Sequence, residues 1–238
     1  MGHNNYFQFK QFMIRQEKSA MRVGTDGVLL GSWTDVSNAK NILDIGTGTG
    51  LIAIMLAQRS KAKITGIEIE VQAANEAIQN AENSPWTNRI KIVHLPFQEF
   101  AAKTEERFDT IVSNPPYFTN AVKSKQDEKS VARHNHSLPF KELLQGVSKL
   151  LTPDGKLSVI LPVNEAINFT KQAKESGLFP SVLTEVKSST NKEPNRQLME
   201  FSQKTINPGI ETLSIFEKNG VDFTDEYKNL TAGFYLNF

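Results

Sequence analysis

The sequence predicts an α/β fold with an open, doubly wound, mostly parallel sheet, because apolar runs of strand length alternate with segments of helical period. Parallel strands need long crossover connections, and these are nearly always right-handed. Helices should therefore cover both faces of the sheet. We expect its parallel strands at residues 41–45, 63–67, 90–94, 108–113 and 156–161.

The helices that alternate with these strands follow from apolar residues spaced at the helical period. We expect helices at Leu51–Arg59, Val71–Glu82, Phe140–Leu151 and Asn164–Glu175. Together with the strands they make residues 41–176 the core of a single domain.

The pattern changes after Gly177, where strand candidates follow one another without helices between them. This predicts an antiparallel C-terminal end over residues 177–238, with strands at 181–187, 197–203 and 211–216. The polar stretch Ser188–Asn195 should be an exposed, mobile hairpin loop. A terminal aromatic cluster should pack against the sheet or the N-terminal segment; its members are Phe234, Tyr235 and Phe238.

Residues 1–40 precede the first strand of the core and predict an N-terminal cap rather than a second domain. Phe7, Phe9 and Phe12 are spaced closely in a short apolar stretch, and residues 25–33 are apolar and punctuated by glycine. A chain of 238 residues is long enough for one sizeable core with additions of this kind.

Composition excludes several classes of protein. The chain contains no cysteine, so disulfides, thiolate metal sites and redox chemistry at sulfur are ruled out. No run approaches the roughly 20 apolar residues of a membrane span, and residues 1–10 lack the apolar core of a signal peptide. A cytoplasmic protein is expected, and the net charge of +1 gives little indication of a polyanionic partner.

A glycine-rich turn follows the first strand of the core and opens a helix. It reads Asp44-Ile45-Gly46-Thr47-Gly48-Thr49-Gly50. Its glycines allow a ligand to approach bare backbone at the carboxyl edge of the sheet. The spacing departs from the G-x-G-x-x-G dinucleotide fingerprint and resembles motif I of class I methyltransferases, which implies a Rossmann-like methyltransferase sheet that binds S-adenosylmethionine.

That resemblance implies roles for the residues of the turn. Asp44 would orient the ammonium group of the donor, and the backbone of Gly46, Thr47, Gly48 and Gly50 would lie along its homocysteine part. An ordinary strand-to-helix turn is the competing interpretation.

Glu68 closes the second strand of the core, where its carboxylate could accept two hydrogen bonds from a ribose diol, with Ile69 beside it. A role in capping the following helix is the alternative. The stretch His94-Leu95-Pro96-Phe97 lacks the Asp that commonly receives the donor's adenine amino group in such enzymes. Phe97 would pack either on that adenine or in the core.

The fourth strand of the core runs into Asn114-Pro115-Pro116-Tyr117 at the same edge. Two prolines stiffen the turn and leave no backbone N–H, so the carbonyls of Pro115 and of the Asn114 side chain can both accept hydrogen bonds. A planar NH2 group has two donors to match. These acceptors would favour the charge-bearing nitrogen of the transition state, and Tyr117 would stack on the acceptor ring.

The motif leaves the acceptor open. Similar Asn-Pro-Pro-Tyr turns occur in DNA adenine, RNA adenine, RNA guanine-N2 and protein glutamine-N5 methyltransferases, and each of these presents a planar NH2 group. A glutamine-N5 enzyme is the first alternative, although its usual helical N-terminal domain is missing here. An RNA-binding module with a vestigial donor pocket and a nicotinamide-dependent oxidoreductase are the others.

Five segments of the chain together point to one family: residues 7–12, 20–33, 114–117, 132–134 and 234–236. They resemble the bacterial tRNA1(Val) adenine-37 N6-methyltransferase family, and the resemblance covers nearly the whole chain. It implies methyl transfer from S-adenosylmethionine to N6 of the adenine beside the anticodon, with tRNA as the partner and no metal. Thr25 and Asp26 would then contact the donor or shape its pocket, with a plain glycine turn as the alternative.

Two basic groups of residues are candidates to meet RNA phosphates, with solvated surface as the other interpretation. The first, in the cap, comprises Lys10, Lys18 and Arg22. The second, comprising Lys123, Lys125 and Arg133, belongs to a long polar loop after the Asn-Pro-Pro-Tyr turn. We expect that loop to be mobile alone and to close over bound RNA. His134 and His136 lack convincing metal-ligand spacing.

Overall fold

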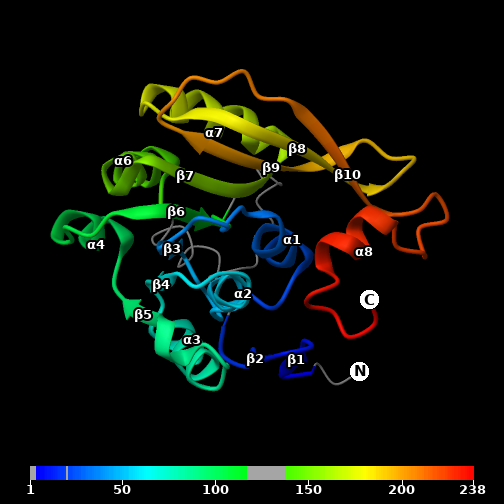
Figure 1. Ribbon diagram of the computed structural model, residues 1–238, viewed down its shortest axis with the longest axis horizontal. Coiled ribbons are helices and arrows are strands. Elements are labelled where there is room, and N and C mark those ends of the chain that lie inside the picture. Colours follow the sequence, from blue (N-terminus) through cyan, green and yellow to red (C-terminus); the bar gives the residue numbers. More distant parts are fainter. Residues whose placement is uncertain (1–3, 20, 117–137) are drawn as a thin grey trace, which may run out of the picture.

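The computed structural model describes residues 4–19, 21–116 and 138–238 (Figure 1). Its centre is an eight-stranded sheet with the strand order β10-β8-β9-β7-β6-β3-β4-β5. All pairings in this sheet are parallel except those that β9 makes with β7 and β8. The strands are β3 (Asn41–Ile45), β4 (Lys63–Glu68), β5 (Ile90–His94), β6 (Phe108–Ser113), β7 (Leu151–Pro162), β8 (Phe179–Ser189), β9 (Pro194–Ser202) and β10 (Ile210–Phe216).

Helices cover both faces of the sheet, as the sequence predicts. Alternate residues of a strand point to opposite faces. Leu43 and Ile45 accordingly lie in a core cluster with α4, α6 and α7, whereas Ile42 lies in another with α1, α2 and α8. The helices are α1 (Thr25–Trp33), α2 (Leu51–Arg59), α3 (Val71–Glu82), η1 (Thr87–Arg89), α4 (Phe97–Lys103), α6 (Phe140–Leu150), α7 (Val163–Glu175) and α8 (Asp225–Thr231).

The N-terminal hairpin of the described residues lies beside the C-terminal segment (Figure 1). Strands β1 (Tyr6–Gln8) and β2 (Met13–Arg15) form a separate hairpin. Phe9 and Phe12 share a core cluster with Phe234, and the Lys10 amide donates to the Phe234 carbonyl over 2.8 Å. Phe234 and Tyr235 therefore pack on the N-terminal segment, one of the two expected positions, whereas the ring of Phe238 lies against Phe223 and Tyr227.

The C-terminal end differs from the expectation in its last strand, because β10 runs parallel to β8. Both edges of β9 are already paired, so the only open position at this end of the sheet is the free edge of β8. β10 begins beside the end at which β9 stops, and it therefore runs opposite to β9. The expected loop over Ser188–Asn195 is also shorter, since only residues 190–193 lie between the strands.

Four helices were not expected from the sequence: α1, α4, α8 and the short 3-10 helix η1. Residues 25–33 of the cap form α1. This helix has no polar face that would give it the usual amphipathic pattern, because six of its nine residues are buried. The short helix α4 connects β5 to β6 and lies against α6. In the described residues, no helix is both long and apolar enough to span a membrane.

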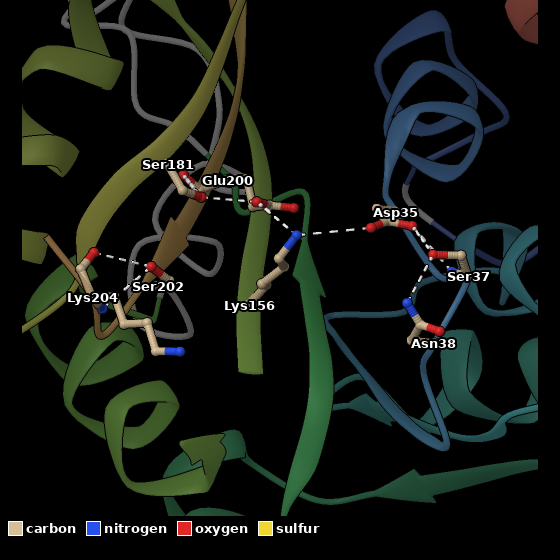
Figure 2. A network of polar contacts seen from close by, with 8 residues as sticks. All are labelled: Asp35, Ser37, Asn38, Lys156, Ser181, Glu200, Ser202 and Lys204. Carbon is tan, nitrogen blue, oxygen red and sulfur yellow. Dashed lines mark hydrogen bonds and ion pairs between the residues drawn. The ribbon is translucent and has the colours of Figure 1, made fainter. Parts of the chain in front are cut away.

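A polar network around Lys156 and Glu200 joins β7, β8 and β9 (Figure 2). The Lys156 ammonium lies 3.2 Å from Glu200 of β9 and 3.7 Å from Asp35, which follows α1. Glu200 also accepts a hydrogen bond of 2.8 Å from the Ser181 hydroxyl of β8. Because Glu200 is only 4% exposed, these contacts stabilise a charge that would be costly to bury alone.

Candidate functional site

The glycine turn after β3 has the backbone geometry that the sequence predicts. Gly46, Gly48 and Gly50 all have positive φ angles, of 72°, 57° and 81°. A Cβ atom added to Gly46 or Gly48 would meet nothing within 4 Å, whereas one on Gly50 would lie 3.4 Å from Ala77 of α3. The turn therefore rests on α3 through Gly50 and exposes bare backbone to open space at Gly46 and Gly48.

Asp44 lies beneath this turn and is completely buried. Its Oδ2 accepts hydrogen bonds from the Thr47 hydroxyl (2.6 Å) and the Ala53 amide (3.2 Å). Its Oδ1 is buried without a hydrogen-bond partner in the described part of the chain. Burial raises the pKa of Asp44 to about 7. A cationic group beside Oδ1 would favour the ionised form and occupy the unpartnered oxygen.

Glu68 connects the glycine turn to the start of α3. One carboxylate oxygen accepts from the Gly48 amide over 2.8 Å, and the other accepts from the amides of Ile69 and Glu70 over 2.9 Å each. These two amides precede the first helical residue, Val71, so the carboxylate holds the segment between β4 and α3 and does not cap the helix itself. The Ile69 carbonyl lies 2.9 Å from a ring nitrogen of His94, so the ends of β4 and β5 are also joined.

Phe97 begins α4 and is 5% exposed. Its ring lies against α6 so closely that a Cβ added to Gly146 would be 2.5 Å from Phe97 Cε1. Leu43 and Ile45 of β3 belong to the same core cluster. The ring thus has core residues as neighbours, as expected if Phe97 packs in the core rather than on the adenine of the donor.

Asn114 follows β6, which lies next to β3 in the sheet. The Ser113 hydroxyl donates to the Ile45 carbonyl over 2.9 Å, and this bond ties the end of β6 to the start of the glycine turn. Asn114 Oδ1 is buried and lacks a hydrogen-bond partner among residues 4–19, 21–116 and 138–238. Pro115 is buried and Pro116 exposed. Tyr117 lies outside the described residues, so its stacking role stays a prediction.

Thr25 and Asp26 form the first turn of α1. Thr25 is exposed, and Asp26 is half-buried. Asp26 Oδ2 lies 3.0 Å from Nε of Arg196, which is on β9. Sequence reasoning did not single out Arg196, because its partner is 170 positions away in the chain.

The basic residues of the cap have different surroundings. Lys10 donates from its ammonium group to the carbonyl oxygens of Ala232, over 2.7 Å, and of Phe238, so it ties the two ends of the chain together. Lys18 and Arg22 are exposed. The loop residues Lys123, Lys125 and Arg133 lie outside the described residues, as do His134 and His136. Elsewhere, in the described part of the chain, no cluster of residues could hold a metal ion.

Glu76 and Asn80 of α3 are site residues that sequence reasoning missed. The buried Glu76 carboxylate accepts from the backbone amides of residues 17, 18 and 19. The Asn80 side chain bonds both backbone groups of Arg15 and donates to the Thr49 carbonyl of the glycine turn, each over 2.9 Å. One feature of the sequence could have identified them: two polar residues stand four positions apart on the alanine-rich buried face of α3.

Comparisons with known proteins match this architecture. The model of a family described as "Methyltransferase domain" matches residues 36–212. A crystal structure of a predicted O-methyltransferase from Agrobacterium tumefaciens has a TM-score of 0.68 at 20% identity, and the match covers 88% of this chain and 96% of that chain. The Thermus thermophilus 16S rRNA N2 G1207 methyltransferase has a TM-score of 0.55 at 20% identity, covering 81% and 47%.

Relatives of known name are closer in sequence. The tRNA1(Val) (adenine(37)-N6)-methyltransferase of Trichodesmium erythraeum is 46% identical over 98% of this chain and 99% of its own length. The protein of the same name from Bacteroides fragilis is 44% identical over 97% and 98%. The chain therefore belongs to the tRNA1(Val) (adenine(37)-N6)-methyltransferase family.

Proposed function

We propose that this chain transfers a methyl group from S-adenosylmethionine to N6 of an adenine in tRNA, namely adenine 37 of a valine tRNA. The observation that carries the proposal is the buried Oδ1 of Asn114, which has no partner in the described residues and directly follows β6, next to the strand that leads into the open glycine turn. The names of the relatives support the choice of substrate. A tRNA substrate would also place the enzyme in the cytoplasm.

The donor site has a shape and a charge that suit S-adenosylmethionine, which supplies an electrophilic methyl group on its sulfonium. Asp44 would hold the ammonium group at its unpartnered Oδ1. The open side of Gly46 and Gly48 leaves room for a ligand chain along the backbone, with Thr47 between them. Glu68, beside Ile69, would accept from the ribose hydroxyls through lone pairs that the backbone amides leave over.

The acceptor site would bind the amino group through two oxygens. Asn114 Oδ1 and the Pro115 carbonyl would accept one N–H each from the planar amino group. The exocyclic nitrogen of adenine is a poor nucleophile, since its lone pair is delocalised into the ring. Fixed acceptors stabilise the positive charge that develops on this nitrogen, and they orient it for in-line attack.

The proposal is tested by incubating the purified protein with labelled S-adenosylmethionine and an unmodified transcript of tRNA1(Val). We expect label in N6-methyladenosine after digestion, and none when adenine 37 is replaced by guanine. Label in a protein glutamine would favour the glutamine-N5 alternative. Binding of donor and tRNA without any transfer would favour the RNA-binding module.

A further inference from the structure

An ion pair joins the cap to the C-terminal half of the sheet at the carboxyl edge. Arg196 Nε lies 3.0 Å from Asp26 Oδ2, and its Nη1 donates to the Asn195 carbonyl over 2.9 Å. The two side chains are 29% and 24% exposed, so the pair is neither fully solvated nor hidden from a ligand. A guanidinium held at two of its nitrogens has a defined orientation.

The strands place this pair next to Asn114. Ser113, the last residue of β6, is the register partner of Val159 on β7, and β7 continues to Pro162. Pro162 is in turn the partner of Arg196 on β9. At about 3.3 Å per residue, β7 and β9 extend roughly 10 Å beyond the end of β6. They form a wall beside the Asn-Pro-Pro turn, and Arg196 lies at the outer end of that wall.

An anion that reaches Arg196 could come from the RNA backbone or from the carboxylate of the donor. The glycine turn follows β3, which is three strands away from β9, whereas Asn114 follows β6, which is two strands away. Strands are spaced about 4.8 Å apart, so the backbone of Arg196 lies about one strand spacing closer to β6, which leads to Asn114, than to β3, which leads to the glycine turn. A base that enters the Asn114 site brings its own phosphates to the rim of that site.

We propose that Arg196 contacts a backbone phosphate beside the target adenine and that Asp26 orients the guanidinium for this contact. The inference rests on the proposed function and adds to it a residue that positions the RNA. Phosphate oxygens are acceptors that match the planar guanidinium fork, and Asp26 limits the rotamers of the arginine before RNA arrives. Such a contact would strengthen binding without reading sequence.

The test compares Arg196→Gln with Lys204→Gln, measuring tRNA affinity by filter binding over a range of salt concentrations. Lys204 follows the opposite end of β9 and pairs with Asp154, so this control removes one positive charge from an ion pair on the same strand pair. We expect Arg196→Gln to weaken tRNA binding about tenfold and to reduce the slope of log affinity against log salt by about one. Lys204→Gln should change neither value.

Donor affinity, measured by calorimetry, distinguishes the two anions that Arg196 could bind, a phosphate of the RNA backbone and the carboxylate of the donor. We expect both variants to bind S-adenosylmethionine within about twofold of the wild type, and Arg196→Lys to regain part of the tRNA affinity. Unchanged tRNA binding in Arg196→Gln would overturn the inference, as would an equal loss of donor affinity. The proposed function is tested separately by the wild-type protein. If the wild type methylates tRNA, the proposed function stands whatever the Arg196→Gln variant does; if it does not, both proposals fall.

Discussion

Two regions of the sheet treat buried polar groups in opposite ways, although Glu200 and Asp44 lie in the same row of register partners across it. Glu200 on β9 is buried and is satisfied by Lys156 and Ser181 (Figure 2). At the carboxyl edge, Asp44 and Asn114 each keep one buried oxygen without a partner in the described residues. A buried acceptor left without a hydrogen bond costs about 1–3 kcal/mol.

This difference separates residues that stabilise the fold from residues that serve a ligand. Ser32, Gln58 and Ser158 also have an unpartnered side-chain oxygen, but they belong to α1, α2 and β7 and not to the strand ends that flank the glycine turn. Asp44 is the next-to-last residue of β3, and Asn114 directly follows the neighbouring strand β6. We conclude that the carboxyl ends of β3 and β6 keep acceptors for the methyl donor and the target amine, while the network around Glu200 stabilises the charges of the fold.

The largest effect is expected for Asn114→Ala. This change removes one of the two proposed acceptors for the reacting amine, so turnover should fall at least tenfold, equivalent to about 1.4 kcal/mol of transition-state stabilisation. Single-turnover methylation of tRNA measures it. Donor affinity should be unchanged, since Asn114 acts on the acceptor. Wild-type turnover in this variant would remove Asn114 from the mechanism.

Asp44→Asn should weaken S-adenosylmethionine binding by about tenfold or more, because it replaces the carboxylate that would face the ammonium group. The same change should stabilise the free protein at pH 8, where wild-type Asp44 holds a buried charge. Calorimetry and thermal unfolding measure the two effects. Donor affinity equal to that of the wild type would show that Oδ1 of Asp44 has another purpose.

The raised pKa of Asp44 also predicts a pH dependence. Because the folded-state pKa, about 7, lies above the value of 3.8 in an unfolded chain, this group stabilises the fold most at low pH. Its contribution is lost as the pH rises through about 7. Donor binding should follow the opposite trend between pH 5.5 and 7, because an ammonium group prefers the ionised carboxylate. In Asp44→Asn, donor affinity should be flat over this range.

A smaller effect, confined to stability, is expected at the network around Glu200. Glu200→Gln leaves the partly exposed Lys156 without its buried partner and should lower the free energy of unfolding by about 1–2 kcal/mol. Urea unfolding measures it. Turnover and donor affinity at 25 °C should match the wild type. A selective loss of turnover would contradict the proposed division between the two regions.

Local patterns in the sequence were enough to predict much of this molecule. The glycine turn and the Asn-Pro-Pro segment are each an unbroken run of residues, so each can be recognised as a motif. The alternation of strands and helices over residues 41–176 is regular. Contacts between distant segments were not predictable. The Asp26–Arg196 pair joins α1 to β9, and Asn80 connects β2 to the glycine turn. The direction of β10 depends on which sheet edge is free, which no local pattern contains.

The most direct test of the two unpartnered oxygens is a crystal structure of the protein with S-adenosylhomocysteine and a tRNA anticodon stem-loop. The proposed function predicts that Asn114 Oδ1 accepts a hydrogen bond of about 2.7–3.2 Å from the exocyclic amine of adenine 37. Asp44 Oδ1 should accept one from the ammonium group of the ligand. A bound ligand and RNA that leave both oxygens without partners would contradict the account.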